Sequence, residues 1–156
     1  MVALNRVQEF VEQYEDLDII LFDSSTHTAE LAAQTLGVTV GQIAKSLVFL
    51  ADGNPILVIT SGDVKVNTKV LAKKVGSKKI RFADSQTVQE QTGFSPGGVS
   101  PVGLLRPLPI YIDQSLYQYS IVYAAAGTAN SALPIAPERL RQITDAHLID
   151  VCQIPT

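Results

Sequence analysis

Apolar side chains recur at helical spacing in several short segments of the chain. Residues 3–15 place an apolar side chain at every third or fourth position with glutamates between them, which predicts an amphipathic helix. The same spacing runs through residues 29–36, with N-cap candidates at residues 23–26 and a helix stop at Gly37. Further helices are predicted from an Asn67 cap to Gly76, from Asp84 or Ser85 to Thr92, and from Pro137 through Ile143, with a short one at 39–42.

Nearly continuous apolar runs separate these helices and predict β-strands. Residues 43–51 and 56–60 are joined by the turn-forming sequence DGNP, which predicts a hairpin. Both runs are apolar almost throughout, so we expect both faces of the hairpin to be covered. The other predicted strands are residues 19–22, 79–83, 108–113, 120–127, 131–135 and 147–151. Mixed strands and helices with hairpin-like connections predict an α+β fold around a mixed sheet or partial barrel.

The composition fits one globular domain over residues 1–156. Apolar residues make up 46% of the chain and charged residues 17%, which is typical of neither a disordered protein nor a coiled coil. No apolar run reaches the roughly 18 residues that cross a bilayer, and the N-terminus lacks the layout of a signal peptide. Cys152 is the single cysteine, so no internal disulfide forms and we expect a cytoplasmic protein. His27, His147 and Cys152 lie too far apart in sequence for usual zinc-ligand spacing, so we expect no metal.

Charge is distributed unevenly along the chain. The net charge is −3, yet seven of the twelve basic residues and no acidic residue lie between Lys65 and Arg81. A basic stripe on an acidic protein suits contact with a phosphate backbone, because each neutralised phosphate releases counterions. The same pattern also fits a solvated, lysine-rich helix face. The sequence leaves both interpretations open.

Residues 93–103, GFSPGGVSPVG, form the most distinctive segment of the chain. Four glycines and two prolines fall within these eleven residues. Glycine permits positive φ and close backbone approach, while proline fixes φ, so the segment predicts a shaped loop. Its free N–H groups could converge on an anion or a polarised carbonyl. A purely structural crossover fits the composition equally well.

Candidate chemistry centres on one lysine. Lys45 lies near the start of an otherwise apolar strand, where it either extends outward to solvent or points into a pocket. No nucleophile elbow or nucleotide-binding glycine motif is present, and the pattern around Cys152 indicates packing. The simplest interpretation of His27 is a polar residue near the start of a helix. A lysine, a donor-rich loop and a basic stripe could together hold an ester next to a phosphate and let water attack.

Four segments resemble the YbaK family. They are IAKSLVF at 43–49, the loop at 93–103, Ile112-Asp113 and Ala126-Gly127. This family comprises aminoacyl-tRNA deacylases related to the editing domain inserted in bacterial prolyl-tRNA synthetases. The order and spacing agree from about residue 20 to the C-terminus, and the pairing of the lysine with G-x-x-x-P at 97–101 is specific.

The resemblance implies a mixed, barrel-like sheet flanked by helices and hydrolysis in trans of esters on mischarged tRNA, chiefly tRNA for proline. It implies no cofactor, since water positioned by the site and by substrate groups would attack. Its implied partners are the aminoacylated end of tRNA and, as a candidate, prolyl-tRNA synthetase; monomer and homodimer both fit. It implies a catalytic, substrate-anchoring role for Lys45. The residues that it implies for substrate binding are Gly97, Gly98, Val99, Ser100, Pro101, Gly103, Asp113, Ala125, Gly127 and His27. The implied contacts to the tRNA backbone come from Lys65, Lys69, Lys73 and Lys74.

The chain departs from the family at two positions. The branch that acts on cysteinyl-tRNA for proline carries a serine and an aspartate where this chain has Ala125 and Ala132. The departure indicates a smaller or more apolar pocket, suited to alanine, serine or threonine. It also keeps open a non-catalytic module that binds tRNA or a synthetase, and a weaker third hypothesis is a small-molecule-binding regulator.

Overall fold

The computed structural model of the protein describes residues 2–23 and 28–153. Its longest strands, β2 (Ile43–Ala51) and β3 (Asn54–Ser61), form an antiparallel hairpin. The turn places Asp52 at φ 49° and Gly53 at φ 85°, the left-handed conformations that a tight hairpin turn requires. The predicted hairpin is therefore confirmed, with a partner strand two residues longer at its start than expected.

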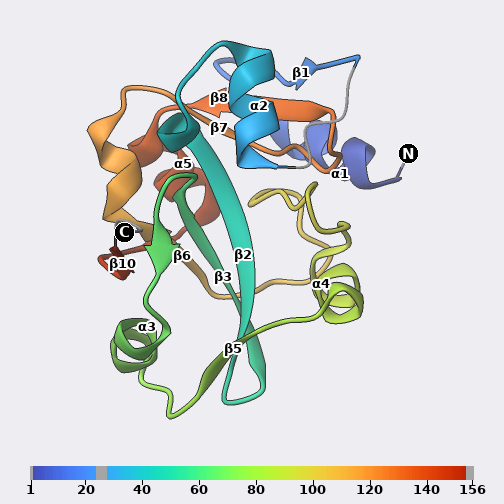
Figure 1. The fold of residues 1–156 in the computed structure, drawn as a ribbon. Coiled ribbons are helices and arrows are strands. Elements are labelled where there is room, and N and C mark those ends of the chain that lie inside the picture. The colour runs from blue at the N-terminus through green and yellow to red at the C-terminus, as the bar shows by residue number, and fades with distance from the viewer. Residues whose placement is uncertain (1, 24–27, 154–156) are drawn as a thin grey trace.

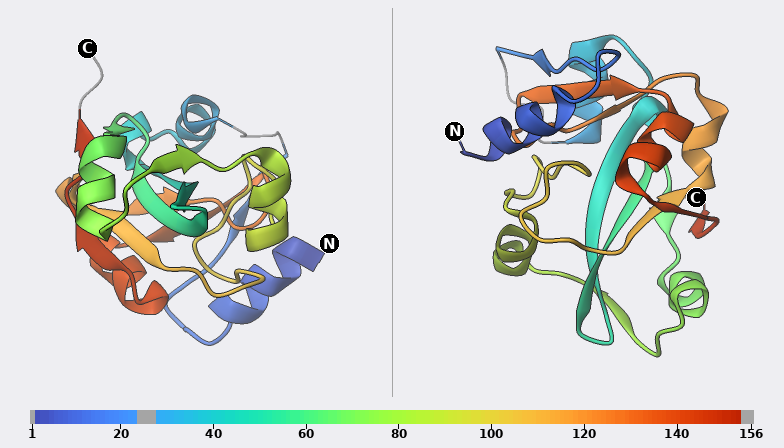
Figure 2. Two further views of the ribbon diagram at one scale, coloured as in Figure 1. Left: turned by 90° about the horizontal axis from the view of Figure 1, so that it is seen from below. Right: turned by 180° about the vertical axis from the view of Figure 1, so that it is seen from behind.

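The hairpin lies at the centre of an eight-stranded mixed sheet, which curls around the core (Figures 1 and 2). Parallel pairs join β2 to β7, β3 to β6 and β6 to β9, and the remaining pairs are antiparallel. The strand order is β1 (Ile20–Leu21), β8 (Ser131–Ile135), β7 (Val122–Ala124), β2, β3, β6 (Ile110–Asp113) and β9 (His147–Ile149), while β5 (Ile80–Phe82) pairs with the far end of β2. A separate ladder joins β4 (Lys65–Val66) to β10 (Cys152–Gln153). The predicted α+β fold is confirmed.

The helices begin and end close to the positions that the sequence predicts. They are α1 (Val2–Val11), α2 (Ala29–Leu36), α3 (Thr68–Val75), α4 (Ser85–Thr92) and α5 (Pro137–Thr144), with 3-10 turns η1 (Val40–Gln42) and η2 (Gln114–Gln118). Asn67 caps α3 by accepting from two backbone N–H groups, and Asp84 caps α4. Thr28 caps α2, so of the predicted candidates Asp23 is not the cap and residues 24–26 lie outside the described part. α1 ends before residue 15 because tighter bonds, such as Tyr14 N to Val11 O, close its last turn.

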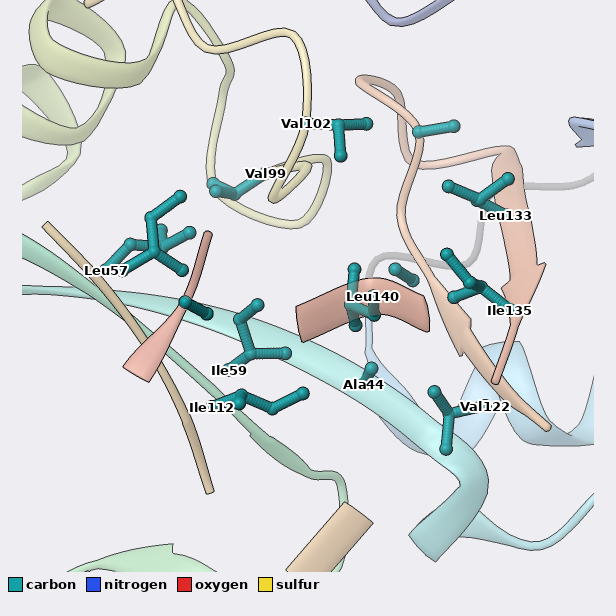
Figure 3. Packing of buried hydrophobic residues seen from close by; sticks show 14 of the residues in the cluster. Ala44, Leu57, Ile59, Val99, Val102, Ile112, Val122, Leu133, Ile135 and Leu140 are labelled. Carbon is teal, nitrogen blue, oxygen red and sulfur yellow. The ribbon is translucent and has the colours of Figure 1, made fainter. Parts of the chain in front are cut away.

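Alternation along the hairpin divides the core between two faces. Ala44 and Val48 face one apolar cluster, which α1, α5 and the 93–103 loop complete (Figure 3). Phe49 and Ala51 face the other cluster, which Leu71 of α3 completes. Successive side chains of a strand point to opposite faces, so one continuous apolar run supplies both clusters. The expectation that both faces are covered is confirmed.

Candidate functional site

A cavity of about 250 Å³ lies where α2, the first half of β2, the β7–β8 region and the 93–103 loop meet. Its walls are largely apolar, with a few polar groups, as is usual for sites that bind small ligand groups. The lining residues are Thr28, Ala29, Ala32, Leu36, Ile43, Ala44, Lys45, Ser46, Leu47, Gly97, Val99, Tyr123, Ala124, Ala125, Ser131 and Ala132. The cavity therefore brings the predicted lysine, the Gly/Pro loop and the two alanine positions together.

Lys45 contributes to this lining from the third position of β2, opposite Thr60 of β3. The residue is half-buried, and its Nζ donates to the carbonyl oxygen of Val64 at 3.0 Å. That bond occupies one of the three N–H donors of an ammonium group, so two remain for a ligand. Lys45 thus borders the pocket, and a backbone carbonyl fixes the position of its charge.

The 93–103 loop is shaped by close backbone packing. Gly98 N donates to Ser95 O at 3.0 Å, and Gly97 in this turn has φ 90°. A Cβ built on Gly98 would lie 3.0 Å from Thr128 Cα, so only glycine lets the loop dock against the turn that follows β7. Within the described residues, no hydrogen bond uses the N–H groups of Gly97 or Val99, both of which line the cavity.

The opposite wall consists of small residues on β8 and after β7. Ala125 is half-buried and Ala132 is 4% exposed. Ser131 Oγ accepts from Ala126 N at 3.2 Å and donates to Thr128 O at 3.0 Å, which ties the turn together. Small side chains on a rigid wall leave room for a group close to the backbone.

Several predicted site residues lie outside the cavity lining. Asp113 is 1% exposed and accepts from Ser115 N at 3.0 Å and from Val151 N at 2.8 Å, so it caps η2 and holds the segment after β9. Gly103 packs against α1, and Ser100 Oγ accepts from Val102 N at 3.1 Å within the loop. Gly98, Pro101 and Gly127 are buried and support the loop and turn around the cavity. His27 lies outside the described residues.

Cys152 does not have the character of a nucleophile. Burial, and next the carboxylate of Asp113, raise the pKa of its thiol, so the thiol stays protonated at neutral pH. Across residues 2–23 and 28–153, no three histidine, cysteine or acidic side chains gather as metal ligands. None of the described helices is both long and apolar enough to cross a membrane.

A family model for the aminoacyl-tRNA editing domain matches residues 23–143, most of the chain and all the elements around the cavity. The chain belongs to the aminoacyl-tRNA editing domain family. This assignment confirms the resemblance of the lysine strand and Gly/Pro loop to the YbaK and prolyl-tRNA synthetase-associated domains.

Similar proteins support the same assignment. YwhH of Bacillus subtilis is 37% identical over 146 residues, covering 92% of each chain. The Enterococcus faecalis protein named "Putative Cys-tRNA(Pro)/Cys-tRNA(Cys) deacylase EbsC" is 27% identical over 96% of this chain and 91% of its own. A crystal structure described as a "putative trans-editing enzyme for prolyl tRNA synthetase" superposes with TM-score 0.90 at 37% identity over 97% of both chains. The proline–tRNA ligase of Bacillus licheniformis is 38% identical over 103 residues, 18% of that protein.

In this editing domain the basic stripe begins beside the cavity. Val64, whose carbonyl binds Lys45, directly precedes Lys65 of β4. Lys65, Lys69, Lys73 and Lys74 are all exposed, the last three on α3. The structure thus places a row of exposed positive charge next to the segment that holds the ammonium of Lys45.

Sequence reasoning missed several residues that line the cavity of this editing domain. The α2 residues Ala29 and Ala32 line it, as do Ser46 and Tyr123. The position of Ser46 beside Lys45 was a usable signal, because a polar pair in an apolar strand is unusual. The α2 residues carried no such signal, since small apolar residues are ordinary on any helix.

Proposed function

We propose that this chain is a trans-acting deacylase that hydrolyses the ester of tRNA for proline mischarged with a small amino acid. The observation that carries the proposal is one cavity lined by Lys45, by the loop residues Gly97 and Val99, and by the small side chains of Ala125 and Ala132. The family assignment gives the class of substrate, an aminoacylated tRNA. The names of the EbsC protein and of the similar crystal structure favour tRNA for proline.

Each side of the cavity has a part in this reaction. Lys45 anchors the terminal adenosine of the tRNA through its phosphate or ribose, using the two donors that Val64 leaves free. The N–H groups of Gly97 and Val99 donate to the ester carbonyl and stabilise the negative charge that develops on its oxygen. Both donors belong to a docked loop and are fixed before substrate arrives.

The chemical step needs only water as a co-reactant. Water attacks the ester carbon, the bond to the ribose oxygen breaks, and that oxygen leaves with a proton; the products are a free amino acid and deacylated tRNA. No aspartate, glutamate or histidine is among the described residues that line the cavity, so a substrate hydroxyl assists the water. Orientation of water and ester then supplies most of the rate enhancement.

The amino acid would be small. Ala125 and Ala132 form an apolar wall in which no side-chain group can recognise a thiol by hydrogen bonding. This wall therefore gives cysteine no advantage over other small amino acids, and alanine fits it without leaving a polar side-chain group unpaired. A pocket of this kind separates substrates that differ by one methylene by about 1–3 kcal/mol.

The test is a deacylation screen on tRNA for proline charged with alanine, cysteine, serine or threonine. Wild type should cleave at least one ester, and Lys45→Ala should lose the activity while keeping its melting temperature. Arg106→Ala is the control, because Arg106 is also an exposed cation but lies outside the cavity lining. If Lys45→Ala unfolds, or stays as active as Arg106→Ala, the anchoring role is wrong.

The absence of a carboxylate or imidazole among the described lining residues also favours a second candidate, a module that binds tRNA without cleaving it. This candidate predicts salt-dependent binding of every charged tRNA and no release of amino acid above the spontaneous rate. The same screen separates the two functions.

A further inference from the structure

One edge of β2 is incomplete beside the cavity. On that edge, the ladder to β7 ends at the pair of Ala44 with Ala124, and the ladder to β5 begins at the pair of Phe49 with Phe82. β7 reaches one end of the long strand and β5 the other (Figure 1). Around Ser46, the described residues provide no neighbouring strand on this edge.

The peptide groups of Ser46 point toward this gap. Val48 O accepts from Ala83 N at 3.0 Å, so the peptide groups of Val48 face the side on which β5 lies. The N–H and C=O of one strand residue point to the same side, and the side changes with each residue. Those of Ser46, two positions earlier, therefore face the same side as Val48, where no strand covers them.

The side chain of Ser46 also lacks a partner among the described residues. Its Oγ is buried and finds no hydrogen-bond partner among residues 2–23 and 28–153, and Ser46 lines the cavity. A buried polar group without a partner destabilises the fold, and such groups in a native protein call for an explanation. Within the described part of the chain, the N–H, the carbonyl and the hydroxyl of Ser46 thus all lack a partner at one side of the pocket.

We propose that Ser46 binds the aminoacyl group of the substrate, which pairs with the open edge of β2 as a single added strand residue. An aminoacyl group carries an ammonium and a carbonyl on the same carbon, the arrangement of a residue in a strand. The carbonyl of Ser46 accepts from the ammonium. The N–H of Ser46 joins the loop N–H groups in donating to the ester carbonyl, and Oγ supplies a third hydrogen bond to the aminoacyl end. Main-chain pairing at an uncovered edge is an established mode of recognition.

This proposal rests on the proposed function and adds a specific consequence to it. The backbone groups of Ser46 would bind the α-ammonium and the carbonyl of the amino acid, which are the same whatever its side chain. The wall of Ala125 and Ala132 would then sort side chains, while Ser46 would require a free α-amino group. An ester whose ammonium is replaced by a hydroxyl should bind less tightly.

The test compares Ser46→Ala with Ser77→Ala, because Ser77 carries the other buried hydroxyl that has no partner in the described structure and lies outside the cavity lining. The probe is 3′-alanylamino-3′-deoxyadenosine, a stable amide analogue of the substrate end, measured by calorimetry. Ser46→Ala should bind it about tenfold more weakly, as expected for the loss of one hydrogen bond. Ser77→Ala should bind like wild type, and neither variant should melt below wild type, since each loses an unpartnered hydroxyl. Ser46→Thr, which keeps the hydroxyl, should bind nearly as wild type does.

Equal binding by wild type and Ser46→Ala would overturn the role of the hydroxyl. Equal binding of the alanyl probe and its lactyl counterpart, in which a hydroxyl replaces the ammonium, would overturn the backbone pairing. Since binding is read without hydrolysis, a wild type that binds the probe but cleaves no ester would count against the deacylase and in favour of the Ser46 site. If wild type cleaves esters, but neither Ser46→Ala nor the lactyl replacement weakens binding of the probe, the deacylase is supported and the Ser46 site is wrong.

Discussion

Arg6 of α1 donates a hydrogen bond from Nε to the carbonyl oxygen of Gly103 at 3.0 Å. Its Nη2 donates to Gly93 O at 2.9 Å, and its guanidinium carbon lies 4.9 Å from the ring centre of Phe94. One side chain therefore holds the first and last residues of the 93–103 loop. Because Gly97 and Val99 of this loop line the cavity, the first helix positions the predicted oxyanion donors.

Replacing Arg6 by alanine should loosen the loop and reduce deacylation by about tenfold or more, since small misplacements of catalytic groups are costly. Hydrogen–deuterium exchange should accelerate in residues 93–103. Arg139→Ala is a closely matched control: Arg139 donates twice to Asp16 and lies 4.9 Å from the ring of Tyr14, away from the loop. If both variants lose activity equally, the effect is one of general stability.

Neutralising the lysines of α3 should weaken tRNA binding and its dependence on salt. Each of Lys69→Gln, Lys73→Gln and Lys74→Gln should lower the slope of log K against log salt by up to about 0.9 if the lysine neutralises one phosphate. The measurement is a titration of tRNA at several salt concentrations, with Arg106→Gln as a charge-matched control outside the stripe. An unchanged slope in all three variants would assign these lysines to a solvated helix face.

Enlarging Ala125 should narrow the cavity and change the preferred amino acid. In Ala125→Val, hydrolysis of the threonyl ester should fall more than that of the alanyl ester, by roughly tenfold or more in the ratio of their kcat/KM values. The alanyl ester serves as the internal control for folding and tRNA binding. A uniform decrease for both esters would place Ala125 outside the amino-acid pocket.

Glu138 should make the fold sensitive to acid. Hydrogen bonds from Arg141, and next from Tyr117 OH at 2.7 Å, lower the pKa of Glu138 from 4.5 to about 2. The ionised carboxylate of Glu138 therefore contributes its full stabilisation above the unfolded-state pKa. This contribution disappears as the pH falls through the folded-state pKa. Between about pH 5 and pH 2, the melting temperature of wild type should fall more steeply than that of Glu138→Gln. Parallel curves would show that this exposed cluster contributes nothing measurable to stability.

Features that depend on neighbouring residues could be predicted from the sequence. Asn67 and Asp84 cap the helices that follow them, because a cap needs only the next three residues. The strand that carries Lys45 and the loop of residues 93–103 were also recognisable, and both line the cavity.

Features that depend on distant pairing could not be predicted in this way. The bond of Arg6 to Gly103 spans 97 positions, and the open edge at Ser46 exists only because β7 and β5 stop short of each other. The β4–β10 ladder consists of two-residue strands, which are too short for a recognisable pattern. Asp113 matched a family motif, yet its carboxylate serves the backbone of η2 and Val151.

The tight turn at Asp52 and Gly53 has an influence at the opposite end of its hairpin. By fixing how β2 aligns with β3, it decides that Lys45 lies opposite Thr60 and that Ser46 follows on the other face. A slip of one residue would exchange the faces of these neighbours and present the ammonium where the hydroxyl now lies. A change in this turn that shifted the register would therefore alter a pocket that the turn never touches, which links the geometry of a surface turn to the shape of the candidate site.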